Sequence, residues 1–366
     1  MSRRLWSGTW LLAALLVLPT YAEEALNDGP YVFHQGEVRE AAWVCDGQVQ
    51  RQPLSADRKL PARCSQAPAL RLEAELAVAP DVQPQPIKWA AVSDIHGQAG
   101  IFLQLLQKQR ILDAAGNWAW GKGVLVIAGD IFDRGPTVTE TLWQVYRLQQ
   151  QAAAAGGAVH FVLGNHETMV LRGDLRYIHP KYQAVAKLLG RSYDALYGPD
   201  TELGAWLRSR ATVLKLGDTV FLHGGLHPEM AAHEIDLPAI NRQFRARLGA
   251  SKEELAKDPE ANALFGRDGP VWYRGYFLPE RATLIDVERL LVRLGAKRIV
   301  VGHTTQSEIR SLYAGRVIGI DAGIKDGERG ELLIWEQGAL WRGLMDGRRL
   351  PLPPGDDDGT SAQESR

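Results

Sequence analysis

The sequence predicts an α/β protein, and three observations carry that prediction. Short apolar runs that end in glycine, such as Val124–Ala128 before Gly129, are typical of strands covered by helices. These runs alternate with amphipathic helical stretches, the pattern of parallel strands joined by right-handed crossovers. Charged and polar residues follow the runs directly, and open α/β sheets place their ligands at the carboxyl ends of strands.

The composition is that of an ordinary globular protein. The 366 residues are 45% hydrophobic and 23% charged, with a formal net charge of -1. This length suits one large domain with appendages or two modest domains. We expect no nucleic-acid partner, because such a partner is typically matched by an excess of basic residues.

The first 22 residues have the layout of a secretory signal peptide. Arg3 and Arg4 give a positive start, residues 11–18 form an apolar run, and Ala22 precedes a polar stretch. The apolar run is shorter than the roughly 20 residues that a membrane span needs. We therefore expect cleavage after Ala22, a periplasmic or secreted protein, and no stable membrane span. An uncleaved membrane anchor is the alternative.

Residues 23–86 are expected to form an N-terminal extension that leads into the main domain. The region has weak periodicity and ends at 79–86 in a proline-punctuated stretch typical of an extended linker. Cys45 and Cys64 are the only cysteines. In an exported protein such a pair is expected to form a disulfide, worth on the order of 3 kcal/mol in the chain-entropy picture. Two buried thiols are the alternative.

Regular alternation of elements predicts a main domain over residues 87–345. Strands are expected at 88–92, 124–128, 158–163, 212–216, 219–222 and 298–301, with antiparallel strands at 309–313, 317–320, 332–335 and 340–341. Helices are expected after residue 97 and within 137–155, 171–210, 236–257 and 284–294. The tail 346–366 is rich in proline, glycine and aspartate and is expected to be disordered.

Five short motifs follow expected strands. They are Asp94-x-His96, Gly129-Asp130-x-x-Asp133-Arg134-Gly135, Gly164-Asn165-His166-Glu167, His223-Gly224-Gly225 and Gly302-His303. One Asp-x-His pair arises often by chance, whereas five such motifs in this order are specific. Asp130, Asp133 and Arg134 also crowd two carboxylates and a guanidinium into a small volume. This crowding predicts a metal site that also binds an anion.

The motifs resemble those of the calcineurin-like metallophosphoesterases. The unaltered GDxxDRG, GNHE and HGG sequences are most similar to the phosphoprotein phosphatase branch, and the resemblance covers about residues 87–344. The secretory signal and the simple domain look like the bacterial Shewanella-like phosphatases. The resemblance implies an α-β-β-α sandwich, with two packed mixed sheets that both supply ligands to one dinuclear site.

The resemblance also implies a ligand set. Asp94, His96 and Asp130 would hold the first ion, and Asp130, Asn165, His223 and His303 the second, with Asp130 as the bridge. Carboxylate, imidazole and amide ligands suit Mn, Fe or Zn, so two divalent metal ions are the expected cofactors. Two such ions about 3.5–4 Å apart can generate a hydroxide and clamp an in-line displacement at phosphorus.

Four further side chains have expected roles. His166 is expected to protonate the leaving-group oxygen, with Asp133 holding its imidazolium form. Arg134 is expected to bind phosphate oxygens in a bidentate manner. By resemblance, Arg274 supplies a second arginine, and Asn165 also contacts substrate. His34, His160, His179 and His233 lack motif context and are interpreted as ordinary surface or core residues.

The expected function is hydrolysis of phosphate monoesters, on a phosphorylated protein, a phosphopeptide or a small phosphomonoester. The last motif reads Gly302-His303-Thr304 and lacks the second histidine of the GHxH pattern in many phosphodiesterase relatives, which favours monoesters. The SAPNY-type segment of eukaryotic phosphatases is also absent, so the choice among phosphoserine, phosphothreonine and phosphotyrosine stays open. A hydrolase of diadenosine polyphosphates or other nucleotides is one alternative. A non-catalytic, metal-bound envelope scaffold is the other.

Overall fold

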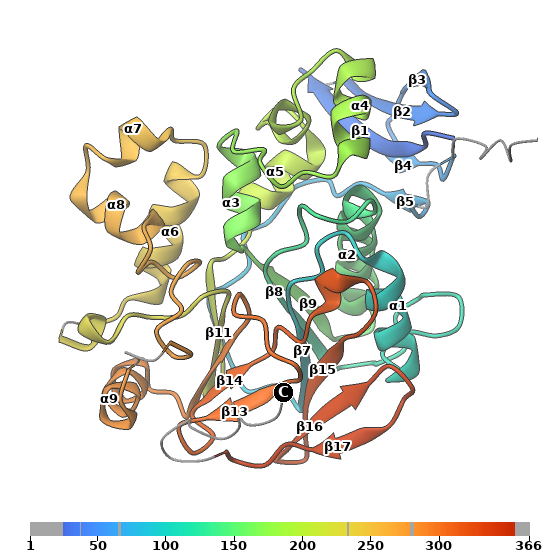
Figure 1. The fold of residues 1–366 in the computed structure, drawn as a ribbon. Helices are drawn as coiled ribbons and strands as arrows, with labels where there is room; N and C mark the ends of the chain where they lie inside the picture. The colour runs from blue at the N-terminus through green and yellow to red at the C-terminus, as the bar shows by residue number, and fades with distance from the viewer. Residues whose placement is uncertain (1–24, 37, 65–66, 233, 279–281, 356–366) are drawn as a thin grey trace, which may run out of the picture.

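Two six-stranded sheets form the centre of the protein, as the computed structural model shows (Figure 1). The structure describes residues 25–36, 38–64, 67–232, 234–278 and 282–355. The expected signal peptide, residues 1–22, lies outside the described residues. Within the described part of the chain, every helix is too short or too polar to cross a lipid bilayer.

The first sheet carries the strand that the sequence singled out, Val124–Ala128. Its order is β17-β16-β15-β7-β8-β9. These strands span Arg349–Pro351, Ala339–Leu344, Glu331–Glu336, Lys88–Val92, Val124–Ala128 and Ala158–Val162. Strands β7, β8 and β9 are parallel, whereas β15, β16 and β17 add antiparallel strands beside β7.

The second sheet has the order β13-β14-β12-β11-β10-β6. These strands span Arg310–Leu312, Val317–Gly319, Arg298–Val301, Thr219–Leu222, Val213–Leu216 and Val82–Gln83. The expected linker 79–86 therefore contains an edge strand, because Val82 and Gln83 pair with Lys215 and Leu216. Its prolines flank that strand rather than interrupt it, which leaves the backbone free to pair.

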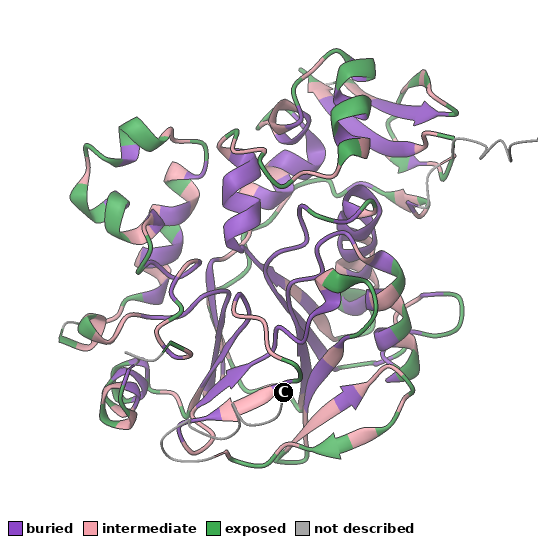
Figure 2. Ribbon diagram, in the orientation of Figure 1, coloured by how far each residue is buried: buried purple, intermediate pink, exposed green. Residues whose placement is uncertain are grey.

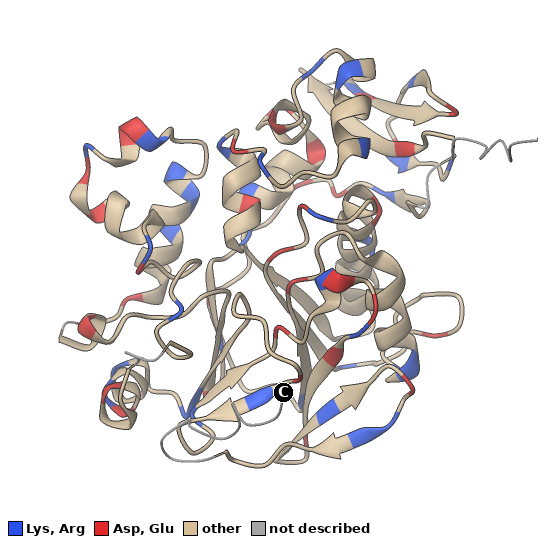
Figure 3. Ribbon diagram, viewed as in Figure 1, with Lys and Arg blue, Asp and Glu red and all other residues tan. Residues whose placement is uncertain are grey.

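Alternating side chains hold the two sheets face to face. Trp89 and Val126 point into the core between the sheets, where they lie with Phe221 and Val300, whereas Leu125 points to the opposite face. The rings of Trp89 and Phe221 pack edge to face with centroids 5.0 Å apart. In Figure 2 the central strands are accordingly purple along most of their length, and in Figure 3 strands β8 and β11 carry no charged residue.

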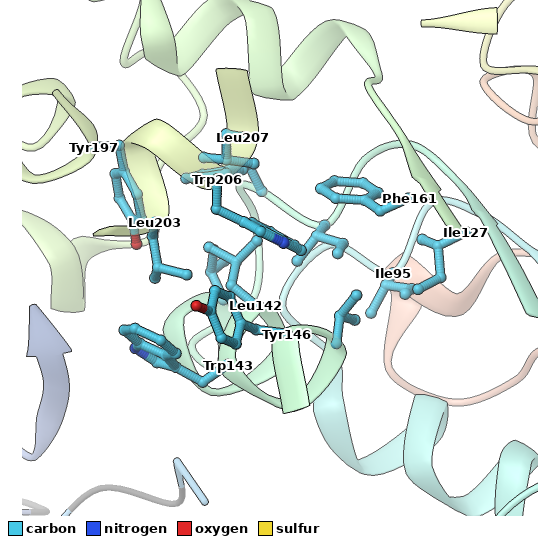
Figure 4. Close-up of a cluster of buried hydrophobic side chains, with 14 of the residues drawn as sticks. Ile95, Ile127, Leu142, Trp143, Tyr146, Phe161, Tyr197, Leu203, Trp206 and Leu207 are labelled. Carbon is cyan, nitrogen blue, oxygen red and sulfur yellow. The ribbon is translucent and has the colours of Figure 1, made fainter. Parts of the chain in front are cut away.

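Helices cover the outer faces of both sheets. Helices α1 (Ala99–Lys108) and α2 (Val138–Ala154) pack on the first sheet, and α9 (Leu284–Leu294) packs on the second. Figure 4 shows Leu142 and Tyr146 of α2 packed close to Phe161 and Trp206. This arrangement confirms the predicted α-β-β-α sandwich.

The remaining helices lie above and beside the sheets (Figure 1). They are α3 (Asn165–Leu171), α4 (Pro180–Leu189), α5 (Glu202–Arg208), α6 (Leu237–Arg247), α7 (Lys252–Leu255) and α8 (Pro259–Phe265), with 3-10 turns at Asp194–Tyr197, Pro228–Ala232 and Ile324–Asp326. Helices α6, α7 and α8 form a group of their own at the left of the view, beyond α3.

The N-terminal extension is folded and packed on the main domain. Strands β1 (Asp28–Gln35), β2 (Val38–Cys45) and β3 (Gln48–Pro53) form an antiparallel sheet, and β4 (Lys59–Leu60) pairs with β5 (Leu70–Arg71). A disulfide joins Cys45 to Cys64, the pairing that the sequence led us to expect. Tyr31, Phe33 and Trp43 are buried in the same core as α2 and α5. The extension therefore shares the hydrophobic core of the main domain.

The expectation of a disordered tail from residue 346 is wrong for residues 346–355. Strand β17 pairs with β16, and Arg349 donates to Gln109 at 3.0 Å and to Glu336 at 3.0 Å. Leu352 adds a backbone bond to Leu340. The edge of the sheet thus stabilises a segment whose composition alone predicts disorder. Residues 356–366 lie outside the described residues.

Candidate metal centre

Loops at the carboxyl ends of strands from both sheets bring six predicted ligands together. Asp94 and His96 follow β7, Asp130 follows β8, Asn165 begins α3 after β9, His223 follows β11, and His303 follows β12. All six are at most 5% exposed. The carboxyl ends of parallel strands share one edge of a sheet, which is why residues distant in sequence meet here.

The carboxylate of Asp130 lies at the centre of this cluster. Its Oδ2 atom is 3.1 Å from Nε2 of His223 and 3.5 Å from Nε2 of His96. Asp130 belongs to two groups whose possible ligand atoms lie within 4.8 Å of one another, one with His96 and His166 and one with His223 and His303. This shared position is the one expected of a bridging carboxylate.

The hydrogen bonds of His223 show that the site fits a cation. Its Nδ1 atom lies 2.8 Å from the carbonyl oxygen of Ala128, so Nδ1 must carry the donated proton. Its Nε2 atom then faces two acceptors, Oδ1 of Asn165 at 2.9 Å and Oδ2 of Asp130 at 3.1 Å. A neutral imidazole would point a lone pair at both oxygens, so either a proton or a metal ion must lie on this side of the ring.

The pKa values of Asp94 and His96 also indicate that the site fits a cation. Burial, together with the negative charges of Asp321 and Asp130, raises the pKa of Asp94 to about 8. Burial lowers the pKa of His96 to about 3, so this ring is in the neutral form that binds metals. Carboxylates gathered away from water need compensating positive charge. The donor set therefore fits divalent metal ions.

His166 and Asp133 form a buried pair beside the cluster. Nδ1 of His166 lies 2.5 Å from Oδ2 of Asp133, which turns Nε2 toward Asp130, 3.9 Å from its Oδ2. Burial opposes a charged ring, but Asp130 and Asp133 outweigh it and raise the pKa of His166. The position of His166 would also allow metal ligation. Its carboxylate partner favours the imidazolium form, which donates a proton and cannot bind a metal.

Two guanidinium groups lie at the mouth of the site. Arg134 is exposed, makes no ion pair with any described residue, and lies over the ring of Tyr177 with its Cζ 5.6 Å from the centroid. Arg274 donates to the carbonyl oxygen of His303 at 2.6 Å. Burial lowers the pKa of Arg274, whereas the negative charges of Asp94, Asp130 and Asp321 act in the opposite direction, and the positive charge of Arg134 adds a smaller lowering. Both guanidinium groups therefore belong to one electrostatic cluster with the carboxylates of the site.

The loops that carry these residues have an unusual backbone. Positive φ angles occur at six predicted site residues: Asp94, His96, Asp130, Asp133, Arg134 and His303. Each costs of the order of 1–3 kcal/mol and persists only where surrounding contacts impose it. Gly97 and Gly135 allow two of these loops to touch, because a Cβ on Gly135 would lie 2.5 Å from the carbonyl oxygen of His96.

Glu167 holds one of these loops, a role that the sequence did not reveal. Its carboxylate accepts hydrogen bonds from the backbone N–H groups of Asp130 at 2.9 Å, Ile131 at 2.8 Å and Gly164 at 2.6 Å. The sequence feature that could have indicated this role is the position of Glu167 as the last residue of the GNHE motif. The sequence motifs also did not identify Asp321 as a residue of the site. It is buried, accepts from Thr305 Oγ1 at 2.6 Å, and adds a third carboxylate near Asp94.

A large open pocket adjoins the site. Its volume is about 1290 Å³, and Arg274 lies in its wall. One side is formed by the end of α3 and the turn after it, and the other by the segment from α7 to residue 268. Its buried lining includes Met169, Leu255 and Phe265. The pocket offers room for much more than a phosphate group.

Comparisons with known proteins agree with this geometry. The Calcineurin-like phosphoesterase family matches residues 87–307. A Schizosaccharomyces pombe protein is 31% identical over 252 residues, which cover 67% of this chain and 75% of that protein. Shewanella-like protein phosphatase 2 of Arabidopsis thaliana is 26% identical over 291 residues, covering 66% of this chain and 73% of the relative.

A solved structure is similar over most of the chain. It is the cold-active protein-tyrosine phosphatase of a psychrophilic Shewanella species, with 43% sequence identity and a TM-score of 0.86. The match covers 89% of this chain and 99% of the other. That coverage exceeds what residues 87–366 alone could supply, so it includes part of the N-terminal extension. The resemblance predicted from the motifs is confirmed, and the chain belongs to the calcineurin-like phosphoesterase family.

Proposed function

We propose that this protein is a phosphoprotein phosphatase that uses two divalent metal ions to hydrolyse phosphate monoesters. The observation that carries the proposal is Asp130, which belongs to two groups of candidate ligands at once. Asp94, His96 and Asp130 would hold one ion, and Asp130, Asn165, His223 and His303 the other. When bound, such ions act as Lewis acids and lower the pKa of water, so a nucleophilic oxygen exists at neutral pH.

The other side chains of the site bind the substrate and move a proton. Arg134 and Arg274 would bind the phosphate oxygens, with Asn165 beside them, and would neutralise the charge that develops during the reaction. His166 would donate its Nε2 proton to the leaving-group oxygen. Its bond to Asp133 at 2.5 Å fixes the ring and favours the charged form that carries this proton.

The pocket supports a protein or peptide substrate. Its volume of about 1290 Å³ suits residues on either side of a phosphorylated side chain, and it opens directly beside Arg274. Shewanella-like protein phosphatases and a protein-tyrosine phosphatase are among the similar proteins. These names support phosphorylated proteins as the substrate class.

The metal and the compartment are part of the same proposal. Imidazole, carboxylate and amide donors suit Mn, Fe or Zn, and no thiolate is present in the site to favour softer metals. The signal-like first 22 residues support export to the periplasm or secretion. The disulfide between Cys45 and Cys64 supports it too, because disulfides persist in oxidising compartments.

An activity panel tests the proposal. Protein purified with Mn²⁺, Fe²⁺ or Zn²⁺ is assayed on p-nitrophenyl phosphate, on peptides with phosphoserine, phosphothreonine or phosphotyrosine, and on diadenosine tetraphosphate. We expect higher kcat/KM on a phosphopeptide than on diadenosine tetraphosphate. The reverse order would favour the nucleotide hydrolase alternative. Binding of inorganic phosphate without turnover of any substrate would favour the scaffold alternative.

A further inference from the structure

A polar network, buried at Asp28 and exposed at Pro136, links the N-terminal extension to the loop that carries Asp133 and Arg134. It begins at Asp28, the first residue of β1, which is fully buried. It passes through Lys181 on α4, whose side chain is 13% exposed. It ends at the carbonyl oxygen of Pro136, two residues after Arg134.

Lys181 connects the two ends of this network. Its ammonium group donates to the carbonyl oxygen of Pro136 at 2.8 Å and lies 2.8 Å from Oδ1 of Asp28 and 3.1 Å from Oε1 of Glu140. Oη of Tyr182 donates to the same carbonyl oxygen at 2.9 Å. A carbonyl oxygen has two lone pairs, so adjacent residues of α4 satisfy Pro136 completely.

Residues 177–182, which lead into α4, hold the loop at a second point. The backbone N–H of Arg134 donates to the carbonyl oxygen of Tyr177 at 2.9 Å. Residues 177–182 therefore contact the loop at Arg134 and again at Pro136. Arg134 itself has a φ of 67°, a conformation that needs such support.

Asp28 fixes this segment from the far side. Its Oδ2 atom accepts from Oη of Tyr31 at 2.5 Å and from Oγ1 of Thr139 at 3.3 Å. The contact of Oδ1 is the ion pair with the Lys181 ammonium, and Oδ1 accepts no hydrogen bond of good geometry from the described residues. Taking an ammonium and a carboxylate out of water costs free energy, and a buried ion pair is often no more stabilising than apolar packing. A gain in overall stability is thus a weak explanation for the ion pair between Asp28 and Lys181. Precise placement of the neighbouring loop explains the pair better.

We propose that Asp28 is a positioning residue for phosphate binding. Its carboxylate holds Lys181 on the Pro136 carbonyl, and this contact fixes the loop so that the Arg134 guanidinium faces the phosphate. The N-terminal extension, which lies outside the matched family region 87–307, thereby completes the phosphate-binding site. The inference rests on the proposed role of Arg134 in binding phosphate.

The chain contains a matched control for this proposal. His34, on the same strand β1, lies 2.8 Å from Oε2 of the buried Glu202 on α5. Glu202 also contacts Arg39 and Tyr146. Its three partners, His34, Arg39 and Tyr146, make no bond to residues 133–136. His34→Gln therefore weakens the docking of the extension without touching the loop.

The test compares inhibition by inorganic phosphate in Asp28→Asn, Lys181→Met, His34→Gln and Arg134→Ala. For Asp28→Asn and Lys181→Met we expect the Ki for phosphate and the KM for p-nitrophenyl phosphate to rise roughly tenfold or more, with less change in kcat and no change in metal content. His34→Gln is expected to retain the wild-type Ki. The double variant Asp28→Asn/Lys181→Met removes both charges, so it can fold even if a single variant does not, and it should show the same rise.

Three outcomes overturn the inference. In the first, Asp28→Asn and the double variant retain a Ki within about twofold of wild type, although Arg134→Ala raises it. In the second, His34→Gln raises the Ki as much as Asp28→Asn does, which indicates a purely structural effect of the extension. In the third, Arg134→Ala leaves the Ki unchanged, which removes the assumed role of Arg134. Failure of the proposed function is a separate result, since the wild-type protein would then hydrolyse no phosphomonoester.

Discussion

Nδ1 of His166 lies 2.5 Å from Oδ2 of Asp133, and both side chains are almost completely buried beside Asp130. The bond leaves Nε2 of His166 directed at Asp130, in the candidate metal centre. One residue of the GNHE motif and one of the GDxxDRG motif, 33 positions apart, thus form a single hydrogen-bonded pair, to which we assign proton donation in the proposed reaction.

His166→Asn tests this assignment. Because the variant has no proton to donate near neutral pH, kcat for phosphopeptides should fall by roughly 10²–10⁴-fold. Metal content should be unchanged, since the six predicted ligands remain, and elemental analysis checks this. His34→Asn is the control, as His34 lies on β1 and contacts Glu202, outside the metal centre and the adjacent pocket. A His166→Asn variant with normal kcat, or one stripped of metal, contradicts the proton-donor role.

Asp130→Asn should lose metal. Asp130 belongs to both candidate ligand groups, and an amide cannot bridge two cations as a carboxylate does. We expect elemental analysis of the purified variant to find less than half of the wild-type metal, with activity lost in parallel. Asp113→Asn, in an exposed loop, makes the same chemical change away from the site. Full metal content in Asp130→Asn would be incompatible with a bridging role.

Glu167→Gln should destabilise the site without removing a predicted ligand. The carboxylate of Glu167 accepts from backbone N–H groups of residues 130, 131, 132 and 164, and an amide would turn a donor toward some of them. The free energy of unfolding should fall by about 1.5–3 kcal/mol, as for hydrogen bonds to charged groups. Urea denaturation measures it. Glu254→Gln, in the exposed capping box of α7, serves as control, and an equal loss there would remove the special role of Glu167.

The stability of the protein should fall as the pH drops from about 6.5 to 4. Burial lowers the pKa of His160 to about 4, and the positive charge of Arg210 acts in the same direction. The unfolded chain, with a histidine pKa near 6.5, binds a proton in this range that the folded chain excludes. In His160→Gln, the decrease in the free energy of unfolding over this pH range should be smaller by roughly 1–3 kcal/mol. Denaturation curves at pH 7.5 and 4.5 measure it, and parallel losses in both proteins would exclude His160 as the cause.

Local sequence predicted the central strands and the motifs well. The expected strands 88–92, 124–128 and 298–301 have the bounds seen in the structure, as does the helix 284–294. Each strand contains an unbroken run of apolar residues and the helix has a regular amphipathic stripe, and such patterns depend on neighbouring residues alone. The motifs that follow the strands are equally local, so the candidate ligands could be named before their distances were known.

The sequence by itself therefore determined the sandwich fold, its family and the residues that gather at the candidate metal centre. Only the tertiary structure placed β6 and β17 at sheet edges, buried β1 in the main core, brought Glu167 to the Asp130 loop, and linked Asp28 to Lys181 across more than 150 residues. These contacts join segments whose own sequences carry weak or contrary signals. Edge pairing and buried polar networks depend on which surfaces meet after folding, and no local pattern records that.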